Sequence, residues 1–73
     1  MIRYKLREMV IEREKTMGTS IPLAEIAKET GINRVTLSKI YHRNDYNATV
    51  KVIDKLCTYF GCEVGDILEH VSD

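Results

Sequence analysis

The chain has 73 residues, and its eleven Lys and Arg balance its eleven Asp and Glu, so it has no net charge with both His neutral. This length suits one small domain, and we expect residues 1–73 to form four or five short helices around a single core. No apolar run approaches the roughly 20 residues that span a bilayer, and the start lacks the apolar core of a signal peptide. We therefore expect a cytoplasmic protein without a membrane contact.

The charges are unevenly distributed along the chain. Residues 28–51 carry five cations against two acids, whereas residues 52–73 carry one Lys against five acids. Such a layout orients the basic part of a protein towards a polyanion, although ordinary surface charge is an alternative reading. The two Cys and two His do not show zinc-type spacing, so we expect reduced thiols and no metal, cofactor or small-molecule ligand.

The first elements in chain order are a short strand and a helix. Residues 1–4 are predicted to pair with residues 69–71 as a minor two-stranded sheet. Residues 5–16 have the pattern of an amphipathic helix, with Leu6 and Val10 on its apolar face. A small polar loop then leads to the next helix.

Residues 21–40 are the most informative part of the chain. Pro22 suits the start of a helix, because it has no N–H to leave unpaired there. Gly31 lies where that helix needs a left-handed exit, and Asn33 is a strong N-cap for the next helix. Leu37 and Ile40 fall on one side of this second helix, opposite a polar and basic side. Two short helices on either side of a Gly turn are the layout of a helix-turn-helix.

The remaining residues predict a loop, a fourth helix and a short last helix. Residues 42–48 read as a loop, and Thr49 is a reasonable N-cap for a helix that ends near Gly61. The apolar stripe expected on this helix comprises Val50, Ile53, Leu56, Cys57 and Phe60. Residues 64–69 are expected to be helical and to bury Ile67 and Leu68. The predicted fold class is all-α, a compact bundle of four to five helices that contains a helix-turn-helix.

Two stretches carry a family resemblance. They are Leu-Ala-Glu-Ile-Ala-Lys-Glu-Thr-Gly-Ile-Asn-Arg-Val-Thr-Leu-Ser-Lys-Ile (residues 23–40) and Lys-Leu-Cys-Thr-Tyr-Phe-Gly-Cys-Glu-Val-Gly-Asp-Ile-Leu-Glu (residues 55–69). The chain resembles the short, single-domain lambda-repressor-like (Cro/cI-type, XRE-family) helix-turn-helix regulators. The resemblance implies a five-helix bundle from a bacterial or phage-like regulator, a homodimer that binds a palindromic operator in double-stranded DNA. Pro22 and Leu23 depart from the Ser/Thr-Gln with which this family often opens the segment.

The resemblance also implies which residues meet DNA, with the helix at residues 34–43 in the major groove. The residues expected to contact bases are Arg34, Val35, Ser38 and Lys39. The residues expected to contact phosphates are Asn33, Thr36, His42, Arg43 and Asn44. Arg at the helix start suits guanine O6 and N7, and Val suits a thymine methyl. Lys39 matches a base-contacting position of the family, but its charge near the helix end, like that of Arg43, makes phosphate the favoured partner.

The predicted function is sequence-specific transcriptional regulation, as a repressor. The alternative is a helical protein-interaction or antitoxin-like accessory module with little direct DNA binding. A basic stripe on the outer face of the helix at residues 34–43 favours DNA, whereas an apolar stripe favours a protein partner. The sequence offers no nucleophile with a base and orienting acid, and no phosphate-cradling Gly loop, so an enzyme is not expected. Exposed apolar residues near the C-terminal end are the expected dimer contact.

Overall fold

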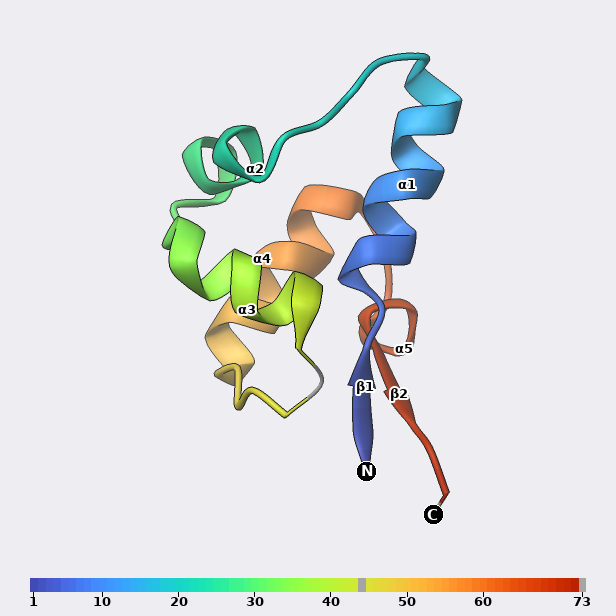
Figure 1. Cartoon of the computed structure of the whole chain (residues 1–73), viewed down its shortest axis with the longest axis vertical. Coiled ribbons are helices and arrows are strands. Elements are labelled where there is room, and N and C mark those ends of the chain that lie inside the picture. Colours follow the sequence, from blue (N-terminus) through green and yellow to red (C-terminus); the bar gives the residue numbers. More distant parts are fainter. Residues whose placement is uncertain (44, 73) are drawn as a thin grey trace.

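The computed structural model describes residues 1–43 and 45–72. The elements in these ranges are, in chain order, β1 (Ile2–Tyr4), α1 (Leu6–Met17), α2 (Leu23–Thr30), α3 (Arg34–His42), α4 (Val50–Phe60), α5 (Val64–Ile67) and β2 (Leu68–His70). The helices α2 and α3 lie on one side of α4 and α1 lies on the other, while both termini lie at the same end of the molecule (Figure 1). The expected helical bundle with a minor terminal sheet is confirmed.

The terminal sheet joins the two ends of the chain. Strands β1 and β2 pair antiparallel, with Ile2 opposite His70 and Tyr4 opposite Leu68. The predicted pairing is therefore confirmed, but the prediction that the last helix runs to residue 69 is wrong. Helix α5 ends at Ile67, because Leu68 has an extended backbone and enters the sheet.

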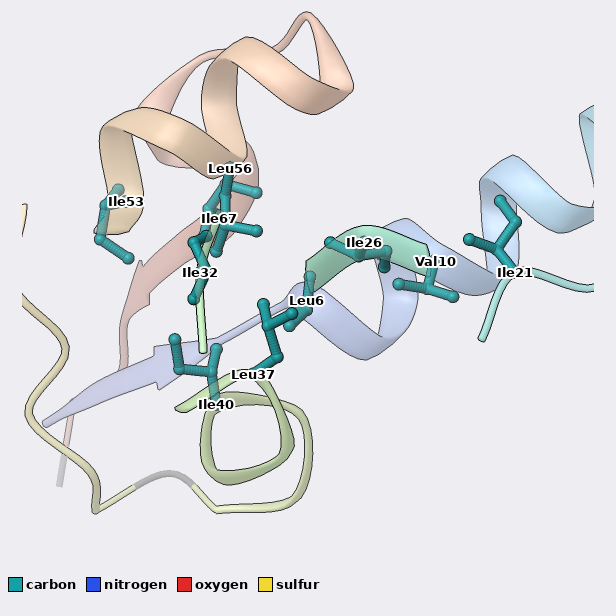
Figure 2. Close-up of a cluster of buried hydrophobic side chains, with 10 residues drawn as sticks. All are labelled: Leu6, Val10, Ile21, Ile26, Ile32, Leu37, Ile40, Ile53, Leu56 and Ile67. Carbon is teal, nitrogen blue, oxygen red and sulfur yellow. The ribbon is translucent and has the colours of Figure 1, made fainter. Parts of the chain in front are cut away.

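Ten aliphatic side chains form the core: Leu6, Val10, Ile21, Ile26, Ile32, Leu37, Ile40, Ile53, Leu56 and Ile67. They come from all five helices and from both segments that flank α2, and they converge between the elements (Figure 2). Fully burying such a side chain stabilises a fold by about 1.5–3 kcal/mol, so this cluster is the main force that holds the helices together.

One residue of the predicted apolar stripe lies outside this core. Val50 is 86% exposed, which contradicts its expected burial. It is the first residue of α4 and its side chain lies outside the core, so among the described residues the buried stripe begins only at Ile53. Cys57 and Phe60 are half-buried and pack against the core as expected, and so does Leu68.

The end of α2 and the start of α3 lie where Gly31 and Asn33 predict them. Gly31 has a φ of +75°, and its N–H donates to the carbonyl oxygen of Ala27 at 2.9 Å. Because this left-handed conformation favours Gly, the residue ends α2 and turns the chain towards α3. The side-chain oxygen of Asn33 accepts a hydrogen bond from the Val35 N–H at 2.7 Å, which confirms the predicted N-cap.

The helix bounds differ from the prediction at the end of α3. Arg43 was expected to be helical, but it is the extended residue that follows His42. Its N–H still donates to the Lys39 carbonyl oxygen at 2.8 Å, which closes the last turn of α3. In the described part of the chain, none of the helices has both the length and the apolar character needed to cross a membrane.

Candidate nucleic-acid interface

The buried face of α3, which carries Leu37 and Ile40, determines which side of the helix points outward. Leu37 and Ile40 are buried in the core, so the helix cannot rotate without exposing them. On the other side, Arg34 is exposed, and Val35 is 61% exposed. Ser38 and Lys39 follow one turn later and are half-buried. The four predicted base-contacting residues are therefore grouped on α3, outside the core.

The predicted phosphate-contacting residues flank this face. At the start of α3, the Asn33 side-chain oxygen is engaged by the helix cap, so only its amide N–H groups remain to meet another partner. Thr36 is half-buried, whereas His42 is exposed at the end of the helix. Asn44 lies outside the described residues.

Two aromatic rings lie beside the C-terminal half of α3. Tyr41 is half-buried and packs against the core, as an aromatic at the edge of a core does. On the loop that follows α3, the ring of Tyr46 lies beside Lys39, whose Nζ is 5.3 Å from the ring centroid. An ammonium at this distance from an aromatic ring is attracted by the ring's negative face, so Tyr46 orients Lys39 towards the loop.

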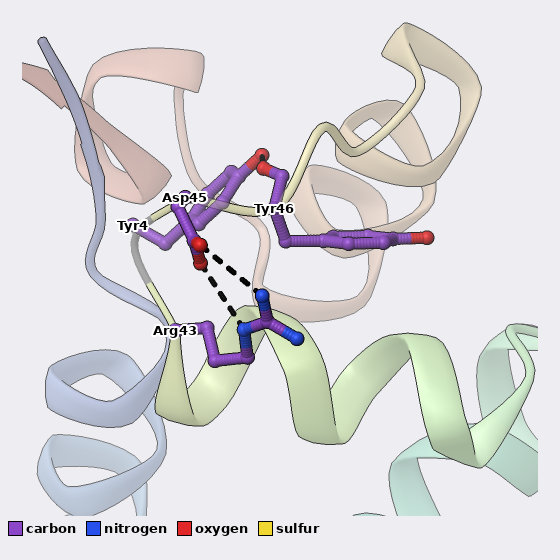
Figure 3. Close-up of polar contacts among 4 residues, drawn as sticks. All are labelled: Tyr4, Arg43, Asp45 and Tyr46. Carbon is purple, nitrogen blue, oxygen red and sulfur yellow. Dashed lines mark hydrogen bonds and ion pairs between the residues drawn. The ribbon is translucent and has the colours of Figure 1, made fainter.

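Arg43 is already paired in the free protein. Its Nε and Nη2 donate to the two carboxylate oxygens of Asp45, each at 3.1 Å (Figure 3). This hydrogen-bonded ion pair raises the pKa of Arg43 and lowers the pKa of Asp45, because the hydrogen bonds and the opposite charge favour both ionised forms. Among the described residues, neither Arg34 nor Lys39 forms an ion pair.

Tyr46 and three further residues that shape this surface were not predicted from the sequence. Asp45 had a local signal, since it stands two positions after Arg43. Tyr4 had none, because it contacts the loop from the other end of the chain: its hydroxyl donates to the carbonyl oxygen of Tyr46 and accepts from the Ala48 N–H at 2.9 Å. The guanidinium carbon of Arg7, on α1, is 6.0 Å from the centroid of the Tyr41 ring.

The possible metal ligands do not form a cluster. Across residues 1–43 and 45–72, no group of three or more His, Cys, Asp or Glu side chains is placed to hold a metal ion. Cys57 and Cys62 are free and half-buried. Burial raises the pKa of the Cys62 thiol, and the neighbouring Cys57 adds to this rise.

A buried rear face, a Gly turn and a capped helix with an exposed polar front define a helix-turn-helix module. The chain belongs to the family of the Cro/C1-type HTH DNA-binding domain, whose family model matches residues 5–73. A search of curated proteins finds no match. The family assignment confirms the resemblance seen in the sequence and makes the chain a DNA-binding regulator that acts on double-stranded DNA.

Proposed function

We propose that α3 reads base edges in the major groove of a specific operator. The observation that carries this proposal is the division of α3 into a buried rear and an outer face bearing Arg34 and Lys39. Val35 is the single aliphatic residue on that outer face, which is otherwise polar and basic. A mainly polar, basic face supports DNA as the partner over a second protein.

The proposed contacts with bases and with phosphates lie at different positions along α3. Arg34 is in the first turn, the part of a recognition helix that meets base edges, and its exposed guanidinium suits O6 and N7 of guanine. In this proposal the exposed Val35 meets a thymine methyl, and the Ser38 hydroxyl donates to or accepts from a base. Lys39 and Arg43 lie nearer the far end of the helix, where cations meet phosphates and supply affinity without sequence preference.

We further infer a symmetric homodimer on a palindromic operator. One helix of nine residues contacts few base pairs, so two copies are needed for a site of useful length. The two half-sites would lie about 34 Å apart, one turn of DNA. Val64, which is 55% exposed at the start of α5, belongs to the apolar surface that we assign to the dimer contact. A bound dimer covers the DNA beneath it, and therefore we expect repression.

The test begins with selection of bound sites from a random pool of DNA duplexes. An enriched motif with two inverted half-sites supports the dimer. Binding of the Arg34→Ala and Lys39→Ala variants is then measured on that motif across a salt series. Lys15→Ala is the control, because Lys15 is exposed in the last turn of α1, outside the proposed interface.

The two variants should fail in different ways. Arg34→Ala should lose preference at one base position, at a cost of about 1–3 kcal/mol, and retain its affinity for unrelated sequences. Lys39→Ala should weaken binding to all sequences and reduce the salt slope by about one. Equal losses and equal slopes for both variants would contradict these roles.

A further inference from the structure

The exposed ion pair after α3 has no evident role in holding the fold together. The side chains of Arg43 and Asp45 are 57% and 73% exposed. Exposed pairs of this kind contribute little to stability, because water and salt screen them. Both oxygens of the Asp45 carboxylate nevertheless face the Nε and Nη2 edge of the guanidinium (Figure 3).

The loop that carries Asp45 is anchored from outside α3. The Tyr4 hydroxyl binds the backbone on both sides of Asn47, at the Tyr46 carbonyl oxygen and the Ala48 N–H. Tyr46 also receives the ammonium of Lys39 on its ring. These contacts fix the backbone directly after Asp45, so its carboxylate is held beside Arg43 by the loop and by β1.

A carboxylate and a phosphate use the same edge of a guanidinium. Each offers two oxygens to a pair of parallel N–H groups, which is why Arg binds both in a bidentate manner. The Nε and Nη2 donors that Asp45 occupies cannot bind a phosphate in the same way at the same time. The other bidentate edge, formed by Nη1 and the second N–H of Nη2, remains open, but a phosphate that approaches it would meet the negative charge of Asp45 nearby.

We propose that Asp45 is an intramolecular competitor that occupies one bidentate phosphate-binding edge of Arg43 and thereby lowers the affinity of the protein for DNA. This proposal rests on the proposed function, in which Arg43 contacts phosphate. Asp45 acts through Arg43, and it is therefore a positioning residue that sets how much of the Arg43 charge is available. Because the competition concerns phosphate alone, it lowers affinity for all sequences to the same extent.

The experiment is a double-mutant cycle on the full chain with a labelled duplex of mixed sequence at low salt. Asp45→Asn removes the charge but keeps the size and shape of the side chain. It should raise the affinity about two- to fivefold, the range of an exposed ion pair. In the Arg43→Ala background the same substitution should have a much smaller effect, because the guanidinium that Asp45 occupies is absent.

Asp54→Asn is the matched control for a simple change in net charge. Asp54 is exposed on α4 and lines a surface pocket with Glu29 and Lys55, away from Arg43. This variant should bind as the parent does. An equal gain from Asp45→Asn in both backgrounds indicates general charge repulsion and would overturn the proposal, as would no gain at all. If the parent and every variant fail to bind any duplex, the proposed function falls together with this proposal.

Discussion

The hydroxyl of Tyr4 offers a sharp test of how the loop after α3 is held. Tyr4→Phe removes one oxygen atom and leaves the aromatic ring, which packs against the core, in place. The lost hydroxyl donates its O–H to the Tyr46 carbonyl oxygen and accepts from the Ala48 N–H. Two backbone groups therefore lose their partner in a single substitution.

The expected cost follows from these two hydrogen bonds. A neutral hydrogen bond contributes about 0.5–1.5 kcal/mol net to the free energy of unfolding. Both bonds are only part-buried, so water replaces the hydroxyl to some extent, and we expect a total loss of about 1–2 kcal/mol. In a domain of this size each kcal/mol lowers Tm by about 4–8 °C. Urea and thermal unfolding followed by circular dichroism measure both quantities.

Tyr59→Phe is the matched control for the loss of a phenolic hydroxyl. Tyr59 is also half-buried against the core, but within residues 1–43 and 45–72 its hydroxyl forms no hydrogen bond, so its removal should cost less than about 0.5 kcal/mol. If Tyr4→Phe and Tyr59→Phe unfold with the same free energy as the parent, the Tyr4 contacts do not hold the loop.

Two further predictions concern the helix cap and a thiol. Asn33→Ala removes the hydrogen bond to the Val35 N–H and should lower the free energy of unfolding by about 1 kcal/mol in urea titrations, whereas Asn33→Asp, which keeps a capping oxygen, should lose much less. Burial raises the pKa of the Cys62 thiol, so less of the reactive thiolate is present at a given pH. Its alkylation by iodoacetamide in the Cys57→Ser variant should rise at a higher pH in the folded chain than in urea, and coincident pH profiles would contradict this.

Local signals were sufficient to predict most of the helix boundaries. Gly31 and Gly61 end α2 and α4 in the left-handed conformation, and Asn33 and Thr49 accept hydrogen bonds from the first turns of α3 and α4. Each of these helix ends depends on groups within a few residues of it, so the local sequence is sufficient to predict where the helix begins or ends. The periodic spacing of apolar residues likewise identified the buried side of α3, and with it the face that carries Arg34.

The failures come from interactions between distant parts of the chain. Val50 fits the helical period of α4, but burial also requires a neighbouring element, and Val50 is left exposed at the start of the helix. Leu68 continues a helical pattern, yet pairing with Tyr4 in β1 draws it into an extended strand. Asp45 pairs with Arg43, only two positions away in the sequence. The loop that holds Asp45 is nevertheless fixed by Tyr4, which lies 42 positions before its contact Tyr46.

Because of these long-range contacts, the orientation of α3 and the position of the loop after it depend on different parts of the molecule. The orientation of α3 depends on Leu37 and Ile40 in the core, while the loop after α3 depends on β1. Strand β1 is itself fixed by β2 and by the hydrogen bond from the Lys5 N–H to the Ile67 carbonyl oxygen at 2.7 Å. On the proposed roles, we therefore expect a change in the terminal sheet to affect Arg43, on the loop side of α3, more than Arg34 at the start of the helix. If those roles hold, substitutions in this sheet should change the affinity for phosphate more than the base preference, which depends on how the core holds α3.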